Sequence, residues 1–185
     1  MLMLLLLWLA PMTSQALTTQ QPYHINETWL LIDSSTARLS VMRGNKVVQH
    51  FDNVAFGTLG TKPVHFLNDS STPTGEFRIN GINRNSRYAL FFSLNYPTLT
   101  HAKIALDDKK ITVEQYLAIF HAIHEGRAPP YNTPLGGMIG IHGLGKASLK
   151  IHKKYNWTRG CVAMTNSQVY QLAKYARIGM RVIIQ

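Results

Sequence analysis

The chain has 185 residues, a length that suits one domain with its own hydrophobic core. Hydrophobic residues make up 45% and charged residues 15%, which excludes an intrinsically disordered chain. The net charge of +10 indicates a solvated basic surface, with attraction to an acidic polymer as the alternative. No long Lys/Arg run or basic stripe with interleaved aromatic residues is present, so nucleic acid is not the expected partner.

The first sixteen residues are predicted to be a signal peptide. Their apolar run is too short to cross about 30 Å of hydrocarbon, and Ser14-Gln15-Ala16 places small residues at the first and third positions of a cleavage site. No Lys or Arg precedes the run, which departs from the usual pattern. We expect cleavage after Ala16, a polar linker over residues 17–26, and a folded domain over residues 27–184.

Strand-like runs dominate the first half of the chain. Strands are predicted over residues 28–33, 37–42, 46–51, 77–80 and 88–94. Gly44-Asn45 separates the second run from the third, which predicts a hairpin. Two further strands are expected over residues 138–141 and 180–184, the first of which leads into His142.

Two helices are predicted by capping boxes. Thr112 with Gln115 begins a helix over residues 111–125, whose shared apolar face is Val113, Tyr116, Leu117, Phe120 and Ile123. His121 and His124 on this helix lack a third ligand with suitable spacing, so no metal site is expected.

The second capping box is formed by Thr165 and Gln168. It begins a helix that ends at Gly179, with an apolar face of Val169, Leu172, Ala173 and Ala176. The fold class is therefore mainly β with two or three helices (α+β), which excludes a doubly wound sheet.

Chemistry is concentrated in two short segments. Cys161, the only cysteine, follows Gly160, and His142-Gly143 lies upstream. A thiol needs a base or a cationic neighbour to act as a nucleophile at neutral pH, and imidazole is the usual partner. A glycine before the thiol allows a tight bend at which backbone N–H groups can converge on an oxyanion. The alternative is a buried structural cysteine with an unrelated histidine.

The spacing of these residues resembles the L,D-transpeptidase (YkuD-domain) family. Its signature is a His, about fifteen residues, then Ser/Thr-His-Gly-Cys, and His142, Thr158, Gly160 and Cys161 match it. Arg159 stands where many members carry a second His. The Thr-Pro-x-Gly-x-Phe block is present as Thr72-Pro73-Thr74-Gly75-Glu76-Phe77. Residues 88–97 and 135–143 are similar to an exported Gram-negative branch of the family, and the resemblance covers residues 27–184.

The resemblance implies a YkuD-like β-sandwich catalytic domain in the periplasm, in contact with the membrane only through export. Cys161 would attack a peptidoglycan tetrapeptide stem and form a thioester, with His142 as the base. The backbone carbonyl of Gly143 would orient His142, and the N–H groups of Gly160 and Cys161 would form the oxyanion hole. An amine acceptor gives cross-links or lipoprotein attachment.

Thr158 and Arg159 are the expected substrate-binding residues, and neither a metal nor an organic cofactor is expected. Water as the acceptor would make the protein an L,D-carboxypeptidase or amidase-type hydrolase on the same bonds. A basic wall-binding module without activity is the non-enzyme alternative. A sortase-like enzyme is disfavoured because no Arg follows Cys161 at short strand spacing. Papain-like proteases place Cys before His, the reverse of the order in this chain.

Overall fold

The computed structural model describes residues 26–185. The predicted signal peptide and the linker up to residue 25 lie outside these residues. Within residues 26–185, no helix combines the length and the apolar character needed to cross a membrane.

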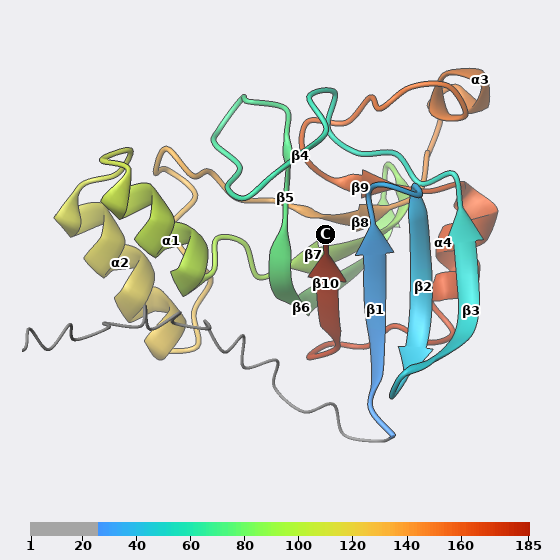
Figure 1. Cartoon of the computed structure of the whole chain (residues 1–185), viewed down its shortest axis with the longest axis horizontal. Coiled ribbons are helices and arrows are strands. Elements are labelled where there is room, and N and C mark those ends of the chain that lie inside the picture. The colour runs from blue at the N-terminus through green and yellow to red at the C-terminus, as the bar shows by residue number, and fades with distance from the viewer. Residues whose placement is uncertain (1–25) are drawn as a thin grey trace, which may run out of the picture.

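Strands form most of the regular structure, as the α+β prediction required (Figure 1). The strands are β1 (Thr28–Asp33), β2 (Arg38–Arg43), β3 (Lys46–Asp52), β4 (Thr61–Lys62), β5 (Thr72–Pro73), β6 (Gly75–Ser86), β7 (Ala89–Leu94), β8 (Gly140–His142), β9 (Val162–Ala163) and β10 (Arg181–Ile184). The helices are α1 (Leu99–Asp107), α2 (Val113–His124), α3 (Leu149–His152) and α4 (Asn166–Leu172).

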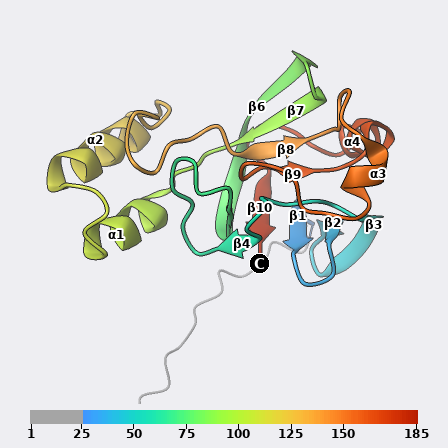
Figure 2. The ribbon, with the colours of Figure 1, turned by 90° about the horizontal axis from the view of Figure 1, so that it is seen from above.

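Eight strands form one sheet in the order β3-β2-β1-β10-β6-β7-β8-β9. The long strand β6 belongs to both halves of this sheet: Gly75–Arg78 pair with β10, and residues 79–86 pair with β7. Figure 2 shows β6 running from the layer of β10 and β1 to the layer of β7 and β8. The bend along β6 therefore produces the two layers of the predicted sandwich.

The far edge of the second layer is joined back to the first by the segment after β3. Ala55 and Ala163 exchange two backbone hydrogen bonds of 2.8 Å, and Thr158 exchanges two of 3.0 Å with Phe56 and Thr58. These bonds hold both ends of the segment 158–163, which carries Cys161.

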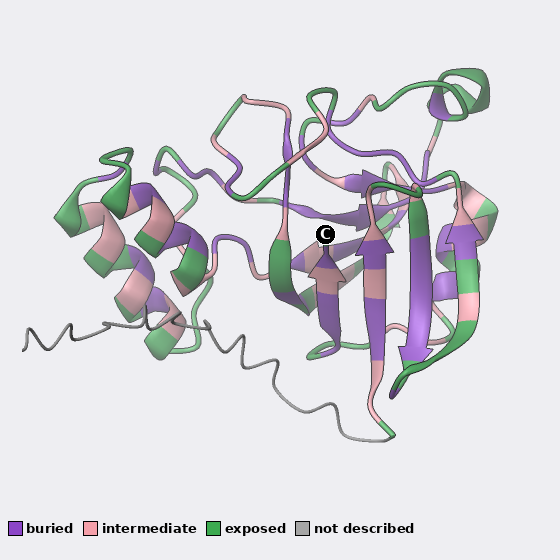
Figure 3. Cartoon of the chain, viewed as in Figure 1, coloured by how far each residue is buried: buried purple, intermediate pink, exposed green. Residues whose placement is uncertain are grey.

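The core lies between the layers (Figure 3). Leu30, Ile32 and Leu39 from the first layer and Phe92 and Ile141 from the second are fully buried. Burial of such side chains contributes about 1.5–3 kcal/mol each, which is enough to fix strand register on both layers.

Both predicted capping boxes are present, at Thr112 with Gln115 and at Thr165 with Gln168. The predicted apolar face of α2 was wrong in part. Its fully buried residues are Ile119 and Ala122, whereas Val113 and Leu117 are exposed. The reason is that α2 packs against α1 rather than across the sheet (Figure 1).

Residues 26–185 form four helices, one more than the upper end of the expected number. Helix α1 has no side-chain cap to reveal it, because the Thr98 hydroxyl is bonded to the His101 ring instead. Helix α4 ends at Leu172 rather than at Gly179. The chain beyond it turns so that Gly179 N–H can bond Ile79 O at 2.7 Å and align β10 beside β6.

Candidate active site

Two neighbouring parallel strands bring His142 and Cys161 together. Strand β8 ends at His142, β9 begins one residue after Cys161, and His142 pairs with Ala163. Because alternate residues of a strand point to the same face, Cys161 lies on the same face as Ala163 and His142. The pairing therefore places thiol and imidazole on one face of the second layer.

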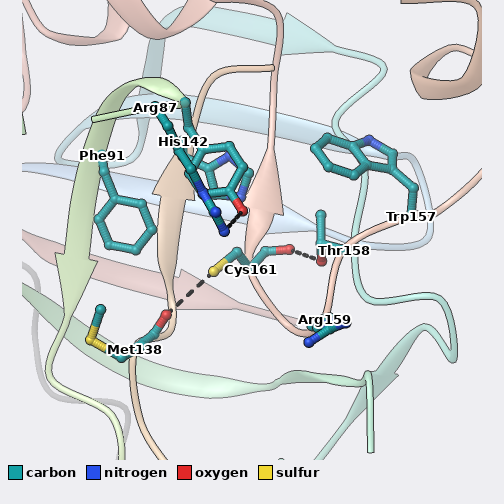
Figure 4. Close-up of a pocket in the computed structure, with 9 residues that line it drawn as sticks. Arg87, Phe91, Met138, His142, Trp157, Thr158, Arg159 and Cys161 are labelled. Atoms are coloured by element: carbon teal, nitrogen blue, oxygen red, sulfur yellow. Dashed lines mark hydrogen bonds between the residues drawn. The ribbon is translucent and has the colours of Figure 1, made fainter. Parts of the chain in front are cut away.

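Both side chains line a single cavity of about 530 Å³ (Figure 4). The volume is in the range of small-molecule sites. The cavity is lined by Arg87, Tyr88, Phe91, Met138, His142, Trp157, Thr158, Arg159 and Cys161.

The imidazole of His142 is held in one tautomer. Its Nδ1 lies 2.7 Å from the carbonyl oxygen of Gly143, and a carbonyl can only accept a hydrogen bond. Nδ1 therefore carries the proton, and Nε2 is the nitrogen left to accept one. The Tyr88 ring stacks on the imidazole with centroids 4.3 Å apart, and the Trp157 ring makes a T-shaped contact with it, with centroids 6.0 Å apart. These contacts fix the plane of the ring.

Burial lowers the pKa of His142, the Gly143 hydrogen bond partly opposes that shift, and the charges of Arg87 and His152 lower the pKa further. The imidazole is therefore neutral at neutral pH and can accept a proton.

The thiol of Cys161 is also neutral. Burial raises its pKa to about 11, although a hydrogen bond with the Gly140 backbone acts in the opposite direction. The Sγ atom also donates to Met138 O at 3.4 Å, so backbone groups rather than His142 engage the thiol (Figure 4). Both pKa shifts favour the neutral forms, a thiol beside an unprotonated imidazole, over a thiolate–imidazolium pair.

Gly160 shapes the turn before the thiol. Its φ is +134°, and an added Cβ would lie 2.9 Å from both Ser71 O and Ile139 Cδ1. The Thr158 hydroxyl accepts from Gly160 N–H at 3.1 Å and donates to Cys161 O at 2.6 Å. Thr158 therefore links the two ends of the turn, and its hydroxyl is hydrogen-bonded to the backbone at both of them.

These bonds distinguish the two expected oxyanion donors. The Gly160 N–H is engaged by Thr158. For the Cys161 N–H, the described part of the chain offers no hydrogen-bond acceptor. The Cys161 N–H is therefore the donor that is available without any rearrangement.

Positive charge surrounds the cavity. Arg87 and Arg159 both line it and both are exposed, and no Asp or Glu is among the lining residues. Such a cavity favours a ligand that carries carboxylates.

Five further residues line the cavity without a sequence signal that marks them as site residues: Arg87, Tyr88, Phe91, Met138 and Trp157. Tyr88, Phe91 and Met138 lie within the segments that resemble the family, but nothing in their spacing indicates that they line a cavity with His142. His121 and His124 lie on α2, outside the cavity. Residues 26–185 contain no group of three or more His, Cys, Asp or Glu side chains placed to hold a metal.

Replacement of Gly160 by alanine should destabilise the protein by about 2 kcal/mol or more, because the φ is strained for alanine and the Cβ meets backbone. Gly126→Ala is the matched control, since Gly126 also has positive φ but nothing within 4 Å of its Cβ. Urea unfolding of both variants measures the difference. Equal losses of stability would contradict the packing role of Gly160.

A neutral thiol predicts a characteristic alkylation profile. The thiolate fraction should increase about tenfold per pH unit between about pH 7 and pH 10, because these values lie below the raised pKa of Cys161. The rate of reaction with iodoacetamide measures this fraction, and the same chain unfolded in guanidinium, with an ordinary thiol, is the control. A rate plateau extending from below pH 7 would instead indicate a preformed ion pair with His142.

Comparison with known proteins agrees with this geometry. The family model described as YkuD, the L,D-transpeptidase catalytic domain, matches residues 27–184. No match was found among curated proteins.

Two solved structures share the fold. The helical cell shape determining protein Pgp2 from Campylobacter jejuni has a TM-score of 0.57 and 19% identity, covering 88% of this chain and 49% of that chain. Bd1075 from Bdellovibrio bacteriovorus has a TM-score of 0.53 and 20% identity, covering 87% of this chain and 48% of that chain. The chain thus spans about half the length of either protein. Because the family match covers most of its length, the chain belongs to the YkuD family of L,D-transpeptidase catalytic domains.

Proposed function

We propose that this chain is a cysteine-dependent L,D-transpeptidase that acts on peptidoglycan tetrapeptide stems. The observation that supports this most strongly is the shared cavity, in which Cys161 lies beside a neutral His142 whose Nδ1 is fixed by Gly143. Acyl transfer by a cysteine requires at least a thiol and a nearby proton acceptor. Family membership makes the wall peptide the proposed substrate.

The first step forms a thioester. The S–H turns from Met138 O towards Nε2 of His142, and sulfur attacks the carbonyl of the L-centre of meso-diaminopimelate. The thiol proton passes to Nε2, and the S–C bond forms. The C–N bond to D-Ala then breaks, and the same proton passes to the leaving nitrogen. His142 ends the step neutral, and D-Ala leaves as a free amino acid.

The tetrahedral intermediate carries a negative oxygen. We assign the Cys161 N–H as its first donor, because no other group engages it in the described structure. The Gly160 N–H can join it when its bond to the Thr158 hydroxyl lengthens. Thr158 thus contributes by holding the turn, and Arg159 is the exposed cation proposed to bind a stem carboxylate.

The second step depends on the acceptor. An amine of a second stem gives a cross-link, an amine of a lipoprotein gives attachment to the wall, and water gives L,D-carboxypeptidase activity. All three acceptors use the same thioester, so they differ only in what enters the cavity after D-Ala leaves. Mass spectrometry of the products from purified muropeptides separates them.

Cys161 and His142 should act as one unit. Cys161→Ala removes the nucleophile, and His142→Ala leaves a thiol that is protonated at neutral pH. Each single variant should therefore lose nearly all the activity that the double variant loses, rather than a share of it. The measurement is D-Ala release from a tetrapeptide muropeptide, with intact-mass detection of the thioester.

The matched control is His124→Ala, an exposed histidine outside the cavity, which should retain activity. Folded Cys161→Ala that still released D-Ala at the parent rate would refute the proposed nucleophile. A parent protein that binds muropeptide but never forms a thioester would instead be the inactive wall-binding module.

We also propose that the protein is exported to the periplasm, with residues 1–16 removed as a signal peptide. The supporting observation is the apolar run that ends in Ser14-Gln15-Ala16. N-terminal sequencing after cell fractionation should find a mature chain that starts near Leu17. Recovery of Met1 on protein from the cytoplasmic fraction would contradict the proposal.

A further inference from the structure

We propose that Arg87 binds the free α-carboxylate of the D-amino acid that leaves the donor stem. This contact would select stems in which a single residue with a free carboxylate follows the cleaved bond. The inference rests on the proposed function, since it assigns a substrate contact within the same cavity.

The backbone of Arg87 is held in a fixed position relative to the site. Arg87 and Tyr88 form the two-residue turn between β6 and β7, in which Ser86 pairs with Ala89. A Cβ on Gly145 would lie 2.1 Å from Arg87 O, which shows how closely the segment after His142 packs on this turn. The turn therefore has a fixed position relative to His142.

Asn166, at the start of α4, secures that packing. Its side-chain oxygen accepts from Gly145 N–H at 2.9 Å, and its amide nitrogen donates to Gly145 O at 3.0 Å. A binding group on a rigid turn loses less conformational entropy when it meets a ligand.

The guanidinium of Arg87 is placed against Tyr88, the residue whose ring stacks on the base. It donates to Tyr88 Oη at 2.9 Å, and its Cζ lies 4.9 Å from the centroid of the Tyr88 ring. The same Tyr88 ring stacks on the imidazole of His142, with ring centroids 4.3 Å apart. Tyr88 thus links the cation to the catalytic imidazole.

The guanidinium of Arg87 has N–H donors that remain available to a ligand. A guanidinium carries five N–H donors, and no Asp or Glu among residues 26–185 forms an ion pair with this one. The side chain is exposed and lines the cavity. It is therefore free to form the two parallel hydrogen bonds with which arginine binds carboxylates.

The electrostatics agree with this placement. Burial is the main cause that lowers the pKa of His142, and the positive charge of Arg87 lowers it further. The electrostatic field of Arg87 therefore acts on the imidazole. A carboxylate bound to Arg87 would offset that charge while His142 holds the proton in transit.

The chemistry of the leaving group supplies the other half of the argument. As the C–N bond breaks, His142 must donate its proton to the D-Ala nitrogen from about 3 Å. The carboxylate carbon of D-Ala lies about 2.5 Å from that nitrogen, since one Cα separates them. The carboxylate carbon therefore lies within about 5.5 Å of the imidazole nitrogen, in the cavity that Arg87 also lines. In the view of Figure 4, Arg159 lies on the other side of Cys161.

The same contact has a consequence for the acceptor. The D-centre of a second meso-diaminopimelate carries its amine and its carboxylate on one carbon, as D-Ala does. When this amine enters along the path that D-Ala left, its carboxylate meets Arg87 as well. An acceptor amine without a neighbouring carboxylate gains nothing from the contact.

The test uses two donor stems that differ only at the last residue, D-alanine or D-alaninamide. We expect kcat/KM of the parent to favour the carboxylate stem by about 10- to 100-fold, the range for a hydrogen-bonded charge. Arg87→Gln should lose that preference, with the amide stem changed by no more than about twofold. Arg84→Gln, an exposed arginine on β6 outside the cavity, should keep the preference.

A second measurement does not depend on turnover. Calorimetry of both stems with Cys161→Ala should show tighter binding of the carboxylate stem, and Arg87→Gln in that background should remove the difference. Thermal melting checks that each variant is folded. An Arg87→Gln variant that keeps the carboxylate preference, or that weakens both stems equally, would overturn the proposal.

The two proposals fail in different ways. A parent that releases neither D-alanine nor D-alaninamide would refute the proposed function, whereas the calorimetry would still decide whether Arg87 binds the carboxylate. A parent that is active on both stems without preference would refute the role of Arg87 and leave the proposed function standing.

Discussion

The parallel pairing of β8 with β9 is the constraint on which the rest of the site depends. Parallel neighbours cannot be joined by a tight turn and need a long crossover connection. Here the crossover runs through residues 143–161 and carries Trp157, Thr158 and Arg159 to the cavity. One pairing thus fixes the base, the nucleophile and part of the cavity wall. The backbone bonds of Thr158 and Ala163 with the segment after β3 hold the crossover in place.

Glycine is required at the points where this connection meets its neighbours. A Cβ on Gly143 would lie 2.7 Å from Tyr88 O, and one on Gly140 would lie 2.5 Å from Phe92 O. Together with Gly160, these residues allow three backbones to approach more closely than side chains permit. This close packing also places the carbonyl of Gly143 where it accepts a hydrogen bond from His142. The same glycine therefore determines both the packing and the tautomer of the base.

Charge is distributed so that the reacting groups stay neutral while the cavity stays positive. Burial lowers the pKa of His142 and raises that of Cys161, so both shifts oppose an ion pair at rest. Arg87 and Arg159, which are exposed, keep their charges at the cavity without a protein carboxylate to neutralise them. A carboxylate-bearing substrate would supply the missing negative charge, and the proton transfer would follow only once the thiol leaves Met138 O.

Local sequence signals determined a good part of this protein. Alternating strand patterns, two capping boxes and the spacing of His142 and Cys161 are short-range features, and they predicted the α+β class and the residues that share the cavity. Helix α1, the early end of α4 and the buried face of α2 depend on contacts between distant segments. Arg87 reaches the site only because the β6–β7 turn packs on Gly145, a contact between residues far apart in the chain. The tertiary structure also decided the neutral state of the thiol, because burial, unlike spacing, is set by everything that packs around it.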